Sequence, residues 1–71
     1  MNGTRPAMSL TPRQRQVLSL MAEGKTTREI AYELGLSPFT VKNYIERIYE
    51  RLGVLDRVQA VSLAMREGLI D

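Results

Sequence analysis

Polar side chains that can bind a nucleic acid are concentrated in residues 37–47, which read SPFTVKNYIER. A helix starting at residue 38 would present most of them on the side away from the apolar residues Val41 and Ile45. Ser37 and Thr40 carry hydroxyl groups, and the start of a helix offers unpaired backbone N–H groups that suit a phosphate. The other polar side chains are those of Lys42, Asn43, Glu46 and Arg47. This combination indicates contacts to both the backbone and the bases of DNA.

Three side chains of this segment match groups on the edges of bases. Asn43 can pair with N6 and N7 of adenine, and the Glu46 carboxylate can accept a hydrogen bond from N4 of cytosine. Phe39, the single phenylalanine of the chain, could touch the methyl group of thymine. Lys42 and Arg47 bring positive charge to the same face, which suits the phosphates.

Each of these residues also has an ordinary structural interpretation. Asn43 is equally typical of a solvated helix position, and Glu46 could pair with Lys42 in an exposed salt bridge of little energetic value. Phe39 could instead pack against a neighbour such as Leu36 at the start of the helix. The sequence leaves these alternatives open.

The composition restricts the chemistry that the chain can perform. It has 71 residues with 0 Cys and 0 His, which excludes disulfides and the usual ligands of zinc and haem. There is also no phosphate-binding loop and no convergent pair of carboxylates, so acid–base and nucleophilic catalysis lack their usual groups. We therefore expect no enzyme activity, no metal, no cofactor and no small-molecule substrate. The net charge of +2 permits a nucleic-acid partner without requiring one.

The sequence carries no recognisable membrane signal. No apolar run approaches the ~20 residues needed to cross a bilayer, and the first residues, MNGTRPAM, lack the apolar segment of a secretory signal. We expect a soluble, cytoplasmic protein. Residues 1–8 are expected to form a disordered arm or the remnant of a linker, and residues 9–71 a single small domain.

Helices are predicted to position these side chains, because an N-cap residue and a glycine punctuate the chain repeatedly. Thr11 and Thr26 each precede a glutamine or glutamate three residues on, which is the spacing of a capping box. Ser37 followed by proline starts a third helix, and Asp56 with a glutamine three residues on starts a fourth. Apolar residues recur on one side of each helix, and no segment reads as a strand. The predicted fold class is all-α, with four helices.

The link between the second and third helices is the most specific structural signal. Only the residues GLS separate Leu34 from the third helix, at 38–52. So short a link makes two helices cross steeply, as in a helix-turn-helix, rather than run antiparallel. Gly35 can take the left-handed conformation that such a turn requires. Two helices of an ordinary bundle would show the same caps and periodicity, but they fit this short link poorly.

The fourth helix, at 57–67, is apolar over more than half of its circumference. A helix packed on one side of a small domain needs an apolar stripe rather than a collar. The surplus predicts a second partner, and we expect a two-fold homodimer in which this helix packs against its copy. The expected interface residues are Val58, Val61, Ser62, Leu63 and Met65. Burial of the helix in a groove of its own chain is the alternative.

Residues 10–70 resemble the LuxR-type, or GerE-like, helix-turn-helix DNA-binding domain of bacterial transcription regulators. The resemblance rests on LTPRQRQVL, on AEGKTTREIAYELGLSPFTVKNYIERIYERLGVLDRVQAV and above all on the pattern EIAxxLGxSxxTVK. It implies a four-helix domain whose third helix enters the major groove and whose fourth helix forms a dimer. It also implies a transcription regulator, often the output domain of a response regulator.

Carried over by position, the resemblance implies a helix-turn-helix unit from Thr27 to Glu46. Thr40 would bind phosphate, Lys42 and Asn43 would read bases, and Glu46 would follow one turn on. The complete set of expected DNA-binding residues is Thr27, Ser37, Phe39, Thr40, Lys42, Asn43, Glu46 and Arg47.

The chain departs from the family at three positions. Gln14, Tyr44 and Glu46 stand where the family often has a glutamate, a histidine and a basic or neutral residue. An ion pair of residue 14 with Arg57 is therefore not carried over, and neither is the operator sequence of any relative.

The leading interpretation is a sequence-specific transcription regulator that binds double-stranded DNA as a homodimer without a cofactor. The alternative in another class is a helix-turn-helix-like interaction module that binds another regulator or RNA polymerase and reads no bases. A sigma-factor-like region of a longer chain is a related alternative. Four acidic residues in the second and third helices favour the interaction module: Glu29, Glu33, Glu46 and Glu50.

Overall fold

Capping groups set the limits of the helices in the computed structural model, which describes residues 10–70. The four helices are α1 (Pro12–Ala22), α2 (Thr27–Leu34), α3 (Pro38–Leu52) and α4 (Arg57–Arg66). No residue from 10 to 70 lies in a strand, and the all-α prediction is confirmed. α3 has the predicted bounds, whereas α4 ends one residue before its predicted limit, with Glu67 as the C-cap. The arm expected at residues 1–8 lies outside the described residues.

Reciprocal capping boxes begin α1 and α2, as predicted. The Thr11 hydroxyl oxygen accepts the Gln14 N–H at 3.1 Å, and Gln14 Oε1 accepts the Thr11 N–H at 2.9 Å. Thr26 and Glu29 repeat this arrangement, with donor–acceptor distances of 3.1 and 2.8 Å. Each box satisfies backbone N–H groups that the start of a helix otherwise leaves unpaired.

The start of α4 differs from the prediction in one contact. Asp56 Oδ1 accepts the Gln59 N–H at 2.9 Å, as expected of an N-cap. Gln59 Oε1, however, accepts the N–H of Leu55 at 3.0 Å instead of that of Asp56. The glutamine therefore holds the chain one residue before the cap, at the point where it enters α4.

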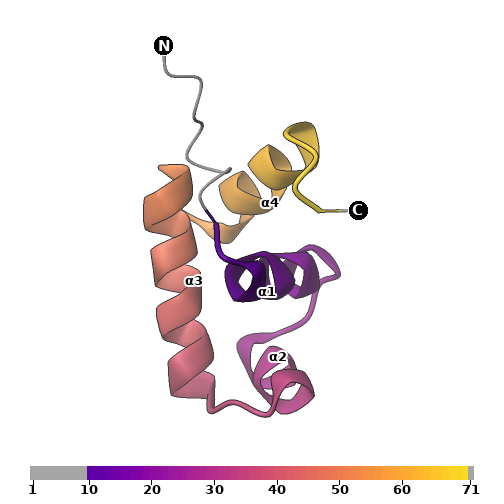
Figure 1. Ribbon diagram of the computed structural model, residues 1–71, viewed down its shortest axis with the longest axis vertical. Coiled ribbons are helices and arrows are strands. Elements are labelled where there is room, and N and C mark those ends of the chain that lie inside the picture. The colour runs from indigo at the N-terminus through magenta and orange to yellow at the C-terminus, as the bar shows by residue number, and fades with distance from the viewer. Residues whose placement is uncertain (1–9, 71) are drawn as a thin grey trace.

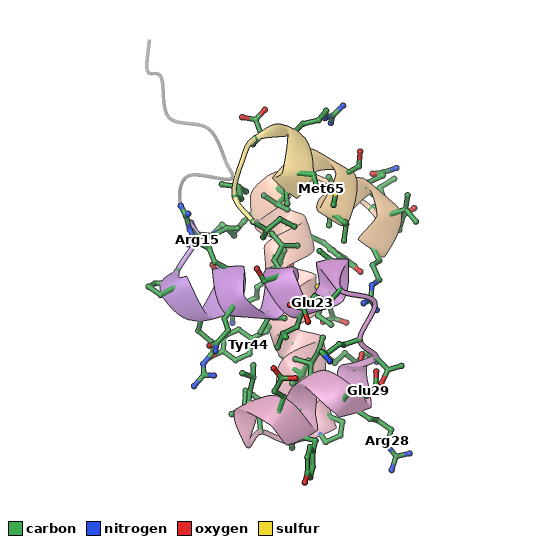
Figure 2. The ribbon with its side chains drawn as sticks, turned by 90° about the vertical axis from the view of Figure 1, so that its right-hand side faces the viewer. Arg15, Glu23, Arg28, Glu29, Tyr44 and Met65 are labelled. Carbon is green, nitrogen blue, oxygen red and sulfur yellow. The ribbon has the colours of Figure 1, made fainter. Side chains whose placement is uncertain are left out.

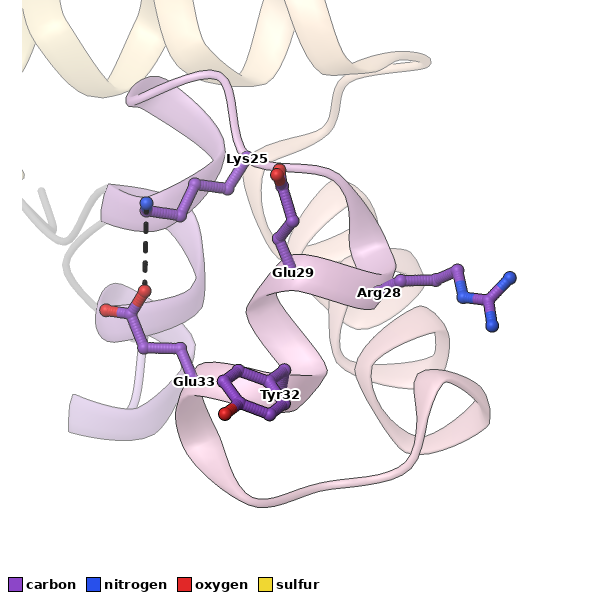
Figure 3. Close-up of a pocket in the computed structure, with 5 residues that line it drawn as sticks. All are labelled: Lys25, Arg28, Glu29, Tyr32 and Glu33. Carbon is purple, nitrogen blue, oxygen red and sulfur yellow. Dashed lines mark ion pairs between the residues drawn. The ribbon is translucent and has the colours of Figure 1, made fainter.

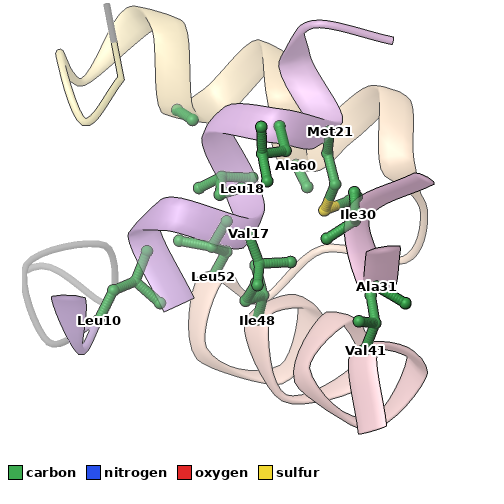
Figure 4. Close-up of a cluster of buried hydrophobic side chains, with 12 residues drawn as sticks. Leu10, Val17, Leu18, Met21, Ile30, Ala31, Val41, Ile48, Leu52 and Ala60 are labelled. Carbon is green, nitrogen blue, oxygen red and sulfur yellow. The ribbon is translucent and has the colours of Figure 1, made fainter. Parts of the chain in front are cut away.

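One apolar core joins the four helices. α3 runs along one side of the molecule and α1 packs across it, while α2 and α4 lie near the two ends of α3 (Figure 1). Fully buried Val17 and Leu18 of α1 meet Ile30 of α2 and Ile48 of α3, and α4 contributes Ala60 (Figure 4). This arrangement separates the α2–α3 turn from the outer surface of α4 by most of the length of the molecule.

Residues 10–70 contain neither a membrane-spanning helix nor a cluster of metal-binding side chains. No helix there combines the length and the apolar character that crossing a bilayer requires. Nor does that part of the chain bring three or more Asp and Glu side chains together in an arrangement that could hold a metal ion.

Candidate nucleic-acid interface

The turn between α2 and α3 has the geometry that a helix-turn-helix needs. Gly35 adopts a left-handed conformation with φ of 70° and ψ of 32°, which glycine accepts without steric cost. The N–H groups of Gly35 and Leu36 donate to carbonyl oxygens of Ala31 and Tyr32, so the last carbonyls of α2 are satisfied. Leu36 packs against the core beneath the turn, as expected.

Ser37 caps α3 and orients a second hydroxyl group at the same helix start. Its Oγ accepts the Thr40 N–H at 3.1 Å, and its own O–H donates to Thr40 Oγ1 at 3.0 Å. Because the Thr40 oxygen accepts this bond, its hydroxyl hydrogen is left to donate outward. The start of α3 also carries a partial positive charge, so this corner of the molecule suits an anion.

Polar side chains line the face of α3 that points away from the core. Val41 and Ile48 are fully buried on the inner side, as the sequence predicted. The exposed polar side chains of the helix are those of Lys42, Asn43, Glu46, Arg47, Glu50 and Arg51. The 3.6-residue period therefore sorts this helix into a buried apolar side and an exposed polar side.

Two shallow depressions run along this polar face. Asn43 and Arg47 line both of them. Thr40 and Tyr44 complete the first depression, toward the start of the helix, and Glu46 completes the second with Glu50. Four predicted contact residues thus form one continuous surface: Thr40, Asn43, Glu46 and Arg47.

The charged groups of this face do not neutralise each other. Among the described residues, no N–O distance within 4.0 Å joins Lys42 to Glu46, although the two lie one helical turn apart. The structure thus gives no support to the alternative interpretation of Glu46 as a member of that salt bridge. Its carboxylate remains an acceptor, and the Lys42 ammonium a donor, for an external partner.

Phe39 retains 72% of its surface exposed. The interpretation in which it packs at the start of α3 is therefore wrong. An exposed phenylalanine beside Ser37 and Thr40 contributes little to folding, because its apolar surface stays in water. The side chain is free to contact a partner at this end of the helix.

A second charged surface lies on α2. Lys25, Arg28, Glu29, Tyr32 and Glu33 line a shallow depression there (Figure 3). Lys25 Nζ lies 3.8 Å from Glu33 Oε1, whereas Arg28 extends away from this pair. Tyr32 is 91% exposed, and the sequence did not predict this exposed aromatic side chain. Its position outside the apolar stripe of Ile30 and Leu34 could have revealed this.

The first turn of α2 is organised by its cap. The Thr26 N–H donates to the Glu29 carboxylate, and this bond holds the pKa of Glu29 below its ordinary value of 4.5. Lys25 adds a smaller effect in the same direction. Thr27, the first residue of α2 and a predicted contact, is half-buried.

α4 packs on the core through two alanines and leaves apolar side chains on the outside. Ala60 and Ala64 are fully buried, whereas Val58 and Met65 are 78% and 60% exposed. A shallow apolar depression between them is also lined by Arg57, Val61 and Ser62. Met65 lies at the opposite end of the molecule from Glu29 of α2 (Figure 2). The chain itself therefore covers Ala60 and Ala64 fully and Val61 and Leu63 in part, and it leaves Val58 and Met65 outside.

Two leucines refine the expected interface. Leu63 is half-buried and packs against the core, on the flank where it lines a neighbouring depression with Leu52. Leu55, just before α4, is 86% exposed and was not predicted. It precedes Asp56, the N-cap of α4, so no helical spacing assigns it to a side of the helix.

Arg57 makes a polar contact between distant segments of the chain, and the sequence did not predict it. Its Nη2 donates to the backbone oxygen of Met21 at 2.7 Å and to that of Lys25 at 2.6 Å. Gln14, at the position considered for an ion pair with Arg57, is engaged in the capping box of α1. Backbone oxygens are present at every residue, so no pattern of side chains could have indicated these acceptors.

Comparison with known proteins is consistent with this geometry. The sequence pattern described as "Bacterial regulatory proteins, luxR family" matches residues 8–64. The chain is 48% identical over 62 residues to the probable transcriptional regulatory protein NarL of Mycobacterium tuberculosis, which covers 87% of this chain and 29% of that protein. It is 45% identical over 62 residues to the transcriptional regulatory protein DesR of Bacillus subtilis, covering 87% and 31%. The chain thus spans less than a third of these curated relatives.

Solved structures show the same arrangement of helices. The structure of the transcription factor GerE is 34% identical and superposes with a TM-score of 0.82, over 87% of this chain and 92% of that one. The response regulator ChrA of a haem-sensing two-component system is also 34% identical, with a TM-score of 0.84 over 87% of this chain and 31% of that one.

Proposed function

The chain belongs to the luxR family of bacterial regulatory proteins, and from this premise we propose that it binds double-stranded DNA with α3 in the major groove. Its relatives are transcriptional regulators with a helix-turn-helix domain, not enzymes. The observation that carries the proposal is the exposed polar face of α3, which the buried residues Val41 and Ile48 turn away from the core.

The residues of this face divide into two kinds of contact. Ser37 and Thr40 bind a phosphate at the start of α3, where hydroxyl and backbone N–H groups coincide with the positive end of the helix. Asn43 and Glu46 read base edges, the first by pairing with adenine and the second by accepting from cytosine. The cations and the remaining predicted residues support these contacts: Thr27, Phe39, Lys42 and Arg47.

The protein acts as a homodimer on DNA. The exposed strip of α4, with Val58, Ser62 and Met65 at its centre, packs against the same strip of a second copy. Two copies then place their α3 helices on half-sites about one helical turn apart, ~10 base pairs. Leu55, just before α4, adds exposed apolar surface near the start of this helix.

We assign residues 9–71 to the DNA-binding domain. The domain works in the cytoplasm and without a cofactor. Its similarity to ChrA and to the other regulators supports a role as the output domain of a response regulator.

Salt dependence tests DNA binding directly. We expect the affinity for duplexes selected from a random pool to fall steeply as salt rises, because phosphate contacts release counterions. The logarithm of the binding constant should fall linearly with the logarithm of salt, with a slope of roughly −0.9 per phosphate contacted. Absence of any duplex binding at low salt would overturn the proposal.

The alternative function is an interaction module that binds another regulator or RNA polymerase without reading bases. The exposed Tyr32, between the acidic residues Glu29 and Glu33, favours a protein contact on α2. The same selection experiment separates the two functions. An interaction module would yield no enriched sequence, whereas a base-reading domain would yield a repeated half-site.

A further inference from the structure

Arg57 stands between the two surfaces that the proposed function uses. It is the first residue of α4, and it lines the apolar depression together with Val58 and Met65. Its guanidinium reaches the other side of the helix start, where Nη2 donates to Met21 O at 2.7 Å and to Lys25 O at 2.6 Å. One side chain therefore touches both the outer surface of α4 and the link between α1 and α2.

The two carbonyl acceptors belong to the backbone that positions α2. Met21 O lies in the last turn of α1, which has no basic side chain of its own. Arg57 supplies the positive charge that suits the negative end of this helix. Lys25 immediately precedes Thr26, the N-cap of α2. A group that holds Lys25 O therefore holds the point from which the helix-turn-helix starts.

Arg57 belongs to a helix that packs on two of the other three helices. α4 packs on α1 and α3, while α2 lies toward the other end of α3 (Figure 1). From the start of α4, the Arg57 side chain bonds to the end of α1 and to the link before α2.

We propose that Arg57 is a positioning residue that couples the dimer surface of α4 to the helix-turn-helix and so sets how strictly the protein selects half-site spacing. This inference rests on the proposed function, because it needs a dimer on DNA. In such a dimer α4 defines the two-fold axis and α3 defines each half-site. Spacing discrimination then depends on how firmly α4 is tied to α2, and a planar guanidinium bonded to two carbonyls provides such a tie.

The test uses duplexes that carry two copies of the half-site enriched by the wild-type protein. Their centre-to-centre distance is lengthened stepwise from about one helical turn by up to about half a turn, ~5 base pairs. Arg57→Met keeps an unbranched, flexible side chain similar to the aliphatic part of arginine but removes its donors. Arg57→Lys keeps the charge but loses the planar fork of donors. Arg13→Ala, which removes a guanidinium that donates to the neighbouring Gln16, is the control.

The expected result separates positioning from stability. The wild type and Arg13→Ala should prefer one spacing by about tenfold or more, within the usual range of coupling between sites. Arg57→Met should reduce this preference to within about threefold, while binding to a single half-site changes by no more than about threefold. Arg57→Lys should show an intermediate preference. All proteins are compared at a temperature at which circular dichroism shows them to be folded.

Three results would overturn the inference. Arg57→Met could keep the wild-type spacing preference, or it could lose single-site and paired-site affinity by the same factor, as a purely structural residue would. If Arg57→Met does not fold, an undiminished spacing preference in Arg57→Lys would overturn the inference. A wild-type protein that binds no duplex would instead overturn the proposed function, and this inference with it.

Discussion

Single residues on α3 should divide into those that set affinity and those that set sequence preference. Lys42→Ala should weaken binding strongly to every duplex, because a lysine that meets phosphate carries no sequence information. Asn43→Ala and Glu46→Ala should instead relax the preference at one base pair each, by about 1–3 kcal/mol. Fluorescence anisotropy with the selected duplex and its single-base variants measures both effects. All three side chains are exposed, so their loss should leave the fold intact.

Two comparisons make this prediction specific. Arg13→Ala removes the same charge as Lys42→Ala but from α1, where the guanidinium donates to Gln16, and it should leave binding nearly unchanged. An unaltered base preference in both Asn43→Ala and Glu46→Ala would contradict their assignment to the reading face.

Phe39 can be tested with a chemical change in the DNA. The side chain is 72% exposed, so Phe39→Ala should change the free energy of unfolding by no more than about 0.5 kcal/mol. If Phe39 touches a thymine methyl group, replacing that thymine with deoxyuridine should weaken binding of the wild type. The same replacement should have no effect on Phe39→Ala. Equal sensitivity of both proteins would mean that Phe39 makes no such contact.

At the scale of the helices, the cap of α2 predicts a pH dependence. The Thr26 N–H donates to the ionised Glu29 carboxylate, which lowers the pKa of Glu29 from its ordinary value of 4.5. A group with a lowered pKa in the folded state stabilises the fold above its unfolded pKa, and this contribution is lost as pH falls through the folded pKa. Wild-type stability should therefore decrease relative to Glu29→Gln as the pH falls below about 4.5.

Urea unfolding of both proteins, at neutral pH and at several acidic values, measures this difference. Glu29→Gln is the matched comparison because its side chain can still accept the Thr26 N–H but no longer titrates there. A constant difference between the two midpoints across the acidic range would exclude the assigned role of this cap. Glu33, on the same helix, provides a second control as Glu33→Gln.

The elements themselves could be predicted because their determinants are local. The Thr11 and Thr26 capping boxes, the Ser37 cap and the left-handed Gly35 each involve residues within a few positions of one another. The prediction for the start of α4 was less accurate. Gln59 Oε1 accepts the N–H of Leu55, and this contact depends on the path of the chain before the helix. Local pattern cannot specify that path.

For the whole molecule, sequence could not predict contacts between distant segments. The carbonyl oxygens that Arg57 holds lie 36 and 32 positions away along the chain, and their identity depends on how α4 packs on α1. The polar face of α3 was predictable from its period, but the exposure of Phe39 and the missing ion pair of Glu46 were not. Those depend on side-chain conformation rather than on spacing.

The outer surface of α4 leads to a prediction about assembly. Val58 and Met65 are exposed and apolar, so Val58→Glu or Met65→Glu should leave the fold intact. In a dimer each change would bury a carboxylate against the partner, which is unfavourable without a paired charge. The dimer should weaken by about tenfold or more, and affinity for paired half-sites should fall with it. Analytical ultracentrifugation and DNA binding measure the two effects.

Leu63→Ala is the contrasting variant on the same helix. Leu63 is half-buried and packs against the core, so its truncation should lower the free energy of unfolding by about 1–2 kcal/mol. Because this truncation places no carboxylate against the partner, dimerisation of the folded protein should change less than in Val58→Glu. Both glutamate variants should keep their affinity for a single half-site, since the start of α3 lies at the other end of that helix from α4 (Figure 1). A wild-type chain that stays monomeric on paired half-sites would show that α4 is not the dimer surface.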